Sequence, residues 1–575
     1  LKSKILPKRS QISQYLRPAS VHANDPALPI KMTINEIRHG KYFSRWMTLS
    51  AGLFFLSISG LSYSYGLYSD DFKTRLNYSQ TSLDLVASFG ELGLWSSILV
   101  GLMLEIFSPR FMIIIGGIIS MLGLSYIAAA LNKTIASSVV TVVAAYYIAN
   151  LGITFGCMTS AALCVRNFPA IDRGKICGFV KSMAGLSSAV LAALFTGFFS
   201  DDKPISFLIL LVFIVPLFGI ISSIPMNVVP ASHLSYQVEL LQGFQPNFEA
   251  FYIWYGLLMA VIVLGISIQA GGIELPRPYW GAGTIVLLAS VYIVPQFYGK
   301  RVIKVDSISE SEPFIREVEP LLGTASDQDG DYEMESRVPS VDPALAIDGD
   351  VGMTLKEGIQ DIRFWSLLFV FMCGAGAGLV VINNISSIAD SLEISASSLL
   401  VSVIGLCNAL GRLIAGWVSD KIVEAGYPRA IVLCINLIMS SLVSLLLSLG
   451  IPTLLYLGSA LAGFAYGSMF SVALAVTGDL FGTKHIATIY GLLDLGPAAG
   501  SFLFATFLVN IVYGDEENCV GRKCFAGTFL ISSMATLFAS FCAYVFLVRP
   551  SLKLLREEKR RLGAGPKKLS KLSLA

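Results

Sequence analysis

The chain contains fourteen apolar runs, and each is close to the roughly 20 residues that a helix needs to cross a bilayer. Of its 575 residues, 54% are hydrophobic and only 14% are charged, whereas a soluble domain carries about 25% charged residues. Water therefore cannot be the main solvent, and we expect an all-α polytopic membrane protein. The predicted transmembrane helices are 46–67, 82–104, 111–131, 137–165, 174–199, 204–229, 250–273, 279–299, 364–386, 396–419, 428–450, 452–481, 485–513 and 525–548.

A short motif repeats at the ends of two of these runs. Gly101-x-x-x-Glu105 returns 315 positions later as Gly416-x-x-x-Asp420. A base follows both copies, at Arg110 in the first and directly after the acid in the second. We expect the glycines to let helices approach closely, and the acids and bases to latch adjacent helix ends in one state of the protein.

A second motif repeats at almost the same offset. Gly178-x-x-Lys181 returns 313 positions later as Gly491-x-x-Asp494. Two repeats at one spacing predict that the chain consists of two related halves, which inside a membrane protein is typical of a transporter.

The order of the runs predicts two six-helix bundles with two helices inserted between them. The inserted pair leaves both bundles in the same orientation. The predicted segments are a basic N-terminal tail (1–45), an N-terminal bundle (46–229), a loop and two inserted helices (230–299), an acidic linker (300–363), a C-terminal bundle (364–548) and a basic tail (549–575).

The distribution of basic residues predicts the orientation. With both termini in the cytosol, 32 of the 41 Lys and Arg residues fall on the cytosolic side and 7 on the other side. The sequons at Asn77 and Asn132 fall on the non-cytosolic side, where we expect glycosylation. Cys519 and Cys524 share a polar loop on that side and are a candidate disulfide.

The polar segments predict location. The first 45 residues are polar and basic, so we expect no cleavable signal peptide. Between Asp306 and Asp350 the linker holds 13 acids, and Glu317 with Leu321-Leu322 fits an acidic dileucine signal that sorting adaptors would read. The alternative is a chance leucine pair. The signal favours a vacuolar or lysosomal-type endomembrane, with the plasma membrane second. The nine bases from Arg549 onward indicate an anionic leaflet.

The two loop motifs resemble the signature of the major facilitator superfamily, between the second and third helices of each half. The first copy departs from the pattern, with Glu105 in place of the usual Asp and Ser108 in place of Gly. Other segments look like the nodulin-like branch of that superfamily, which is similar to fungal homologues of monocarboxylate transporters. These segments are Asn167-Phe-Pro169, Arg173-Gly174, Gly185-Leu-Ser187, Phe364-Trp365, Cys373-Gly374, Asn383-Asn384 and Gly411-Arg412. The resemblance covers about residues 46–550 without the linker. It implies two bundles that rock about a central cavity.

Ionisable residues inside the predicted spans are candidates for function, because a charge at the bilayer centre costs about 2.5–3.5 kcal/mol on insertion scales. They are Glu91, Lys181, Arg412, Asp494 and, less deeply, Asp479. Lys181 and Asp494 lie on equivalent helices of the two halves. One hypothesis is that Lys181 binds an anionic substrate while Glu91 or Asp494 takes a coupling proton. The alternative is that these residues form salt bridges of a cytosolic gate. We assign Arg412 a gating role, with Asp420 as a candidate partner.

Uncharged polar residues form a stripe on the helices that would line the cavity. The candidates for the cavity are Tyr63, Asn150, Asn383, Asn384 and Tyr466, although each could instead join two helices. The glycine run that precedes Asn383 makes local unwinding of its helix easy. Pro497 predicts a kink.

The sequence therefore predicts a secondary active transporter of a small solute that works by alternating access. The favoured solute is a small organic anion such as a monocarboxylate, with possible coupling to protons. The alternatives are a cation or metal-ion transporter of the same fold, and a non-transporting receptor or sensor. We expect no enzyme activity, cofactor, resident metal or nucleic-acid partner, since no nucleotide-binding motif or histidine cluster occurs in the sequence.

Overall fold

The computed structural model describes residues 45–61, 65, 69–199, 204–228, 248–270, 277–298, 352–394, 397–513 and 521–561. Regular structure in these ranges is helical, apart from one isolated antiparallel bridge between Gly352 and Gly482. Helices suit a bilayer, because backbone groups in lipid have no water to bind and must pair within their own segment. The all-α class predicted from the sequence is confirmed.

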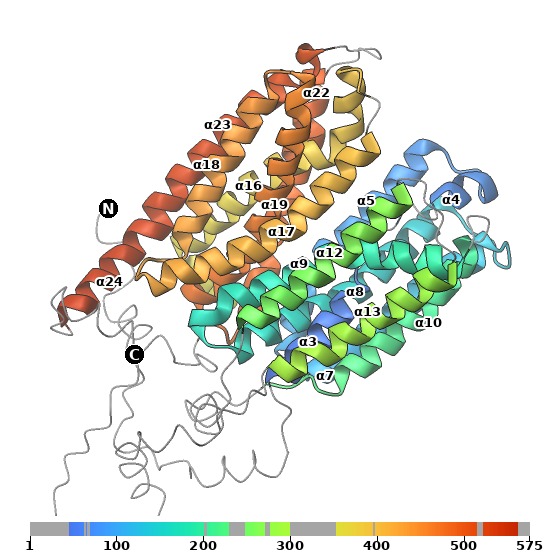
Figure 1. The fold of residues 1–575 in the computed structure, drawn as a ribbon, viewed down its shortest axis with the longest axis horizontal. Coiled ribbons are helices and arrows are strands. Elements are labelled where there is room, and N and C mark those ends of the chain that lie inside the picture. The colour runs from blue at the N-terminus through green and yellow to red at the C-terminus, as the bar shows by residue number, and fades with distance from the viewer. Residues whose placement is uncertain are drawn as a thin grey trace, which may run out of the picture.

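The helices form two bundles that lie side by side (Figure 1). The N-terminal half, blue to green, contains α3 (Arg45–Leu56), α4 (Ser69–Arg75), α5 (Gln80–Trp95), α6 (Ser97–Leu104), α7 (Pro109–Leu131), α8 (Val139–Asn167), η2 (Ala170–Asp172), α9 (Arg173–Phe198), α10 (Pro204–Ser223), α12 (Phe248–Ala270) and α13 (Arg277–Tyr298). The C-terminal half, yellow to red, contains α15 (Leu355–Gln360), α16 (Ile362–Ser391), α17 (Ser397–Glu424), α18 (Ala430–Leu447), α19 (Pro452–Phe481), α20 (Ile486–Leu493), α21 (Leu495–Gly500), η5 (Ser501–Leu508), α22 (Val509–Tyr513), η6 (Arg522–Cys524), α23 (Ala526–Ala543), η7 (Tyr544–Val548) and α24 (Arg549–Arg561).

Eleven stretches of the described helices are long and apolar enough to cross a membrane. They coincide with eleven of the fourteen predicted spans. The other three predictions fall on α3, α12 and α13, whose described apolar parts are shorter. The total of fourteen therefore stays a prediction.

The two inserted helices belong to the N-terminal half. Helix α13 packs against α3 and α9, and α12 lies against α9 and α13 (Figure 1). Phe179 of α9 is in ring contact with Phe251 and Tyr255 of α12, with centroids 4.3 and 5.3 Å apart. The insertion thus thickens one bundle without separating it from the other.

Two membrane helices are interrupted near their middle. The first break is at Ser96, between α5 and α6, and the second is at Asp494, between α20 and α21. Pro497 explains the second break, because its ring cannot donate to the carbonyl of Leu493 and clashes with it. The kink predicted from Pro497 is confirmed as an interruption three residues before it.

The glycine run of the first helix after the linker stays helical in this structure, although glycine makes unwinding easy. Helix α16 runs without interruption from Ile362 to Ser391. Other helices pack closely against its glycines. A Cβ on Gly374 would come within 2.1 Å of the methyl carbon of Met469, and one on Gly376 within 3.0 Å of the Cα of Gly500. Tight packing holds the segment helical where its propensity alone would not.

Candidate functional site

The two halves are bonded to each other toward one end of the molecule. Every described hydrogen bond or ion pair between them joins a residue in 97–105 or 170–182 to one in 409–429 or 479–494. We call this the closed end, and it is the end predicted to be cytosolic. Among the described residues, no such bond joins the halves at the opposite end.

The glycines of both repeated motifs lie where helices of opposite halves cross. A Cβ on Gly416 of α17 would come within 2.3 Å of the carbonyl oxygen of Gly174 on α9. On the other side of the molecule, a Cβ on Gly101 of α6 would come within 2.5 Å of the Cα of Thr488 on α20. Gly178 and Gly491 face the opposite half in the same way. These glycines let the backbones touch, as helix packing in lipid requires.

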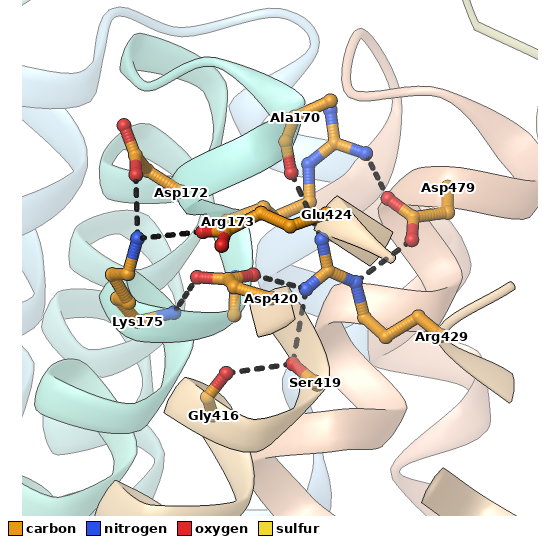
Figure 2. A network of polar contacts seen from close by, with 11 residues as sticks. Ala170, Asp172, Arg173, Lys175, Gly416, Ser419, Asp420, Glu424, Arg429 and Asp479 are labelled. Carbon is orange, nitrogen blue, oxygen red and sulfur yellow. Dashed lines mark hydrogen bonds and ion pairs between the residues drawn. The ribbon is translucent and has the colours of Figure 1, made fainter. Parts of the chain in front are cut away.

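Asp420 joins the C-terminal half to the first turn of α9 (Figure 2). Its two carboxylate oxygens accept hydrogen bonds of 2.8 Å from the backbone N–H groups of Gly174 and Lys175. A carboxylate is stabilised at this position because the N–H groups of a helix N-terminus are unpaired and carry partial positive charge. Asp420 is fully buried, so the bond is shielded from water.

Arg429 and Asp479 extend this network across the same seam. Arg429 donates to Asp420, to Oδ2 of Asp479 at 2.8 Å and to the carbonyl of Ala170 in the other half at 2.9 Å. Asp479 also accepts from Arg173 of the N-terminal half at 2.5 Å. Figure 2 shows these side chains converging between the two bundles. The partner of Asp420 is therefore Arg429, and the pairing with Arg412 predicted from the sequence was wrong.

Glu105 forms the second contact at the closed end. Its Oε1 accepts from the hydroxyl of Thr488 at 2.5 Å and lies 3.1 Å from Nδ1 of His485, both in the C-terminal half. Arg110 bonds within its own half, to the carbonyl of Met226 at 3.1 Å. The acids of both loop motifs thus join the halves, whereas Arg110 forms its hydrogen bond within the N-terminal half.

The equivalent residues Lys181 and Asp494 lie near each other at the seam. Oδ2 of Asp494 accepts a hydrogen bond of 2.8 Å from Ser97, beside the break in the opposing helix. Its Oδ1 is buried and has no hydrogen-bond partner among the described residues. The Lys181 ammonium lies 4.5 Å from the centre of the Tyr490 ring. It forms no ion pair in the described structure, although it is close enough to Asp494 to interact electrostatically.

Arg412 lies next to Lys181, in an aromatic setting. Its guanidinium donates to the backbone carbonyl of Lys181 at 2.5 Å and lies 5.3 Å from the centre of the Phe470 ring. Phe470 is in turn 5.9 Å from Trp95 of the other half and 4.9 Å from Tyr466. Two neighbouring cations therefore lie on aromatic faces, an arrangement that stabilises positive charge away from water.

The side chain of Glu91 is accessible at its surface although protein surrounds most of it. It is one helical turn before Trp95 on α5, and the Trp95 ring lies 5.9 Å from that of Phe470 in the C-terminal half. This spacing places Glu91 on the face of α5 that points toward the other half.

The asparagines predicted to line the cavity mainly join helices. Asn384 donates to the carbonyls of Val380 and Ala505, and Asn383 donates to Ser501 at 3.3 Å. Asn150 is buried, donates to the carbonyl of Tyr146, and leaves its Oδ1 without a partner among the described residues.

Several predicted residues fall away from the seam or outside the described ranges. Asn77 and Asn132 are exposed in loops. Cys524 is in a disulfide. No group of three or more metal-ligating side chains occurs in the part of the chain that the structure describes. The predicted residues that lie outside this part are Tyr63, Glu317, Leu321, Leu322 and Cys519.

Some residues of the seam were missed by sequence reasoning. Ser97, Tyr490 and Thr488 carry no charge and resemble ordinary helix residues. His485 belongs to no histidine cluster in the sequence. Their contacts join segments nearly 400 positions apart, and no local pattern reports such a distance.

The comparisons with known proteins identify the fold. The chain is similar to the solved proton:xylose symporter XylE of the major facilitator superfamily, with a TM-score of 0.51, 12% sequence identity and coverage of 87% of this chain and 95% of that chain. The protein therefore has the major facilitator fold.

Sequence comparison places the chain within that class. The Nodulin-like family model matches residues 45–296, and the model of the NFD4 C-terminal domain matches residues 345–554. The chain belongs to the nodulin-like family of major facilitator superfamily transporters.

Two similar proteins match different shares of the chain. Protein NUCLEAR FUSION DEFECTIVE 4 of Arabidopsis thaliana is 22% identical over 92% of this chain and 93% of its own length. The probable transporter MCH1 of Yarrowia lipolytica is 25% identical over 35% of this chain, and the match spans 45% of that protein.

Proposed function

We propose that this transporter carries a small organic anion, with a monocarboxylate as the favoured substrate. The observation that carries the proposal is the Lys181 ammonium, which lies at the seam between the halves with no carboxylate within ion-pair distance in the described structure. Lys181 is close enough to interact electrostatically with the Arg412 guanidinium as well as with the Asp494 carboxylate, so a second cation adds to its positive field. An anion arriving at this level would restore the balance of charge.

We further propose that Asp494 takes the coupling proton. Its unpaired Oδ1 is open to a proton, whereas its Oδ2 is held by Ser97 of the opposite half. Ionised Asp494 would attract the Lys181 ammonium. Protonated Asp494 would release that attraction and leave Lys181 to the substrate, so that proton and anion would move together.

Alternating access would require the closed end to part. The bonds to be broken are those of Asp420 to the first turn of α9, of Arg173 to Asp479, and of Glu105 to Thr488. The substrate would then leave through the closed end, which we assign to the cytosol from the distribution of basic residues. The vacuolar or lysosomal-type location, sorting through the dileucine signal and glycosylation of Asn77 and Asn132 are parts of the same proposal.

A cation or metal-ion substrate is the competing proposal. It rests on Glu91, an accessible acid on the face of α5 that points toward the C-terminal half. The alternative function that involves no transport is that of a receptor, which keeps the fold without moving a solute.

Flux in proteoliposomes separates these functions. The purified chain would be reconstituted and supplied with radiolabelled pyruvate, lactate or a monovalent cation, with and without an inward proton gradient. We expect saturable uptake of a monocarboxylate that the gradient accelerates. Uptake of cations alone would favour the competitor. Binding without flux for every solute would favour the receptor.

A further inference from the structure

A cavity lies at the closed end, away from Lys181 and Asp494. Its volume is about 200 Å³, which is several times the roughly 30 Å³ that a water molecule occupies in the liquid. Its walls come from both halves. Glu105, Pro109 and Arg166 belong to the N-terminal half, and Lys484 and His485 to the C-terminal half.

Positive charge dominates the lining. Arg166 and Lys484 are cations, and they outnumber the one acid among the lining residues, Glu105. The acid on the wall, Glu105, is already bonded to Thr488 and His485. Lys484 is exposed and forms no hydrogen bond or ion pair among the described residues. A cation is therefore available to an anion from solution.

The first turn of α20 adds to this field. The helix begins at Ile486, and His485 at its N-cap makes no side-chain capping bond. The N–H groups of Ile486 and Thr488 already donate to backbone carbonyls, so Ala487 supplies the N–H of this turn that has no backbone partner among the described residues. An unpaired N–H at a helix start attracts anions. A cavity that offers an Arg, a Lys and a helix N-terminus suits an oxyanion with several acceptor atoms and a double charge.

We infer that this cavity binds a small phosphate-bearing anion, as a site separate from the one for the transported solute. Because its walls belong to both halves, the cavity has this shape only while the closed end is shut. A ligand that binds one state better shifts the population toward that state. Bound phosphate would therefore hold the closed end shut and slow the transport cycle. The inference needs only the rocking of the two bundles and is independent of which solute they carry.

The first test is binding of radiolabelled inorganic phosphate to the purified full-length chain. Lys484→Gln should weaken binding at least about tenfold, which corresponds to the loss of a charge-assisted contact. The matched control is Lys356→Gln, since Lys356 is an exposed lysine on the neighbouring helix α15 and does not line the cavity. Arg166→Gln tests the wall of the other half. Equal binding by wild type and Lys484→Gln, or no saturable binding, would overturn the inference.

The second test reports the state of the closed end. Ser182 is buried where α9 meets α17, and its hydroxyl donates to the carbonyl of Ala409. A cysteine in its place, Ser182→Cys, should react with a maleimide only when the halves part at this end, after subtraction of labelling in the parent chain. At a phosphate concentration ten times its Kd, the ratio of closed to open protein should rise about 11-fold and labelling should slow accordingly. Labelling that ignores phosphate would contradict the inference.

Two controls identify the source of the phosphate and the independence of the site. Protection in nanodiscs that contain phosphatidic acid, lost in Lys484→Gln, would assign the same site to a lipid headgroup; protection by free phosphate in neutral lipid would assign it to a soluble anion. Lys181→Ala should leave phosphate binding unchanged. A parallel loss in that variant would place phosphate in the central site and overturn the inference.

Discussion

The hydroxyl of Ser97 donates a hydrogen bond of 2.8 Å to Oδ2 of Asp494, across the seam between the two halves. The two residues lie at the breaks of two interrupted membrane helices, one in each half. Helix breaks leave backbone groups and side chains free to change partners, and in lipid they are tolerated where protein or a cavity surrounds them. The bond therefore links the proposed coupling acid to an element that can move relative to it.

Asp494→Asn should uncouple transport from the proton gradient. The amide oxygen can still accept from Ser97, but the side chain can no longer gain or lose a proton. We expect solute exchange between equal concentrations to persist, while the acceleration by an inward proton gradient disappears. The measurement is counterflow compared with gradient-driven uptake in the same vesicles. A variant that still responds fully to the gradient would exclude Asp494 as the proton acceptor.

Gly416→Ala should force the closed end apart. The new Cβ would lie 2.3 Å from the carbonyl oxygen of Gly174, a backbone atom that cannot turn aside. The bundles can relieve this overlap only by separating, so we expect faster labelling of Ser182→Cys in the double variant. Gly405→Ala on the same helix is the matched control, because a Cβ there meets nothing within 4 Å. Equal labelling of both variants would contradict the assigned crossing.

Asp420→Ala should destabilise the closed end strongly. The substitution leaves the buried Arg429 without one of its acids and two N–H groups of α9 without an acceptor. Breaking a buried pair costs about 3–5 kcal/mol. We expect a lower Tm together with faster labelling of Ser182→Cys.

The control for Asp420 is Glu424→Gln on the same helix, at the exposed edge of the network. Glu424 is 33% exposed, bonds to Lys421 at 2.7 Å and lies 3.9 Å from Lys175 of the other half, and exposed pairs of this kind contribute about 0–1 kcal/mol. A similar Tm loss in both variants would mean that the buried network has no special role.

Thr488→Val should weaken the second contact of the closed end. The substitution keeps the side-chain shape and removes the hydroxyl that donates to Glu105. We expect a modest gain in labelling of Ser182→Cys, equivalent to about 1–3 kcal/mol for a hydrogen bond to a charged group. Thr477→Val offers a comparison within one half, since Thr477 donates only to the carbonyl of Ala473 in its own helix. Thr477→Val should leave labelling at the parental rate.

Much of the fold could be predicted from hydropathy and from the repeated glycines. Apolar length predicts the spans because lipid imposes it, and Gly101 and Gly416 are predictable because only glycine admits such close helix crossings. The partner of Asp420 was not predictable in this way. Arg429 and Arg412 are both basic and both lie within nine residues of the acid in sequence, and only the packed helices decide which one reaches it.

The site shows the same division. Lys181 and Asp494 could be selected because charge in a membrane is expensive. The contact between Phe470 and Trp95 beside these residues could not be predicted, since aromatic residues in an apolar run carry no distinguishing signal. The continuity of α16 was also hidden: the contacts of Gly374 and Gly376 with other helices override their low helix propensity.

The central claim is that Lys181 receives the substrate anion, and counterflow of a labelled monocarboxylate in proteoliposomes tests it most directly. Lys181→Ala should reduce the rate at least about tenfold, or about 1.4 kcal/mol, and Lys181→Arg should restore part of it. Lys421→Ala, which removes an exposed lysine paired with Glu424, should transport like wild type. Undiminished counterflow in Lys181→Ala would contradict the account.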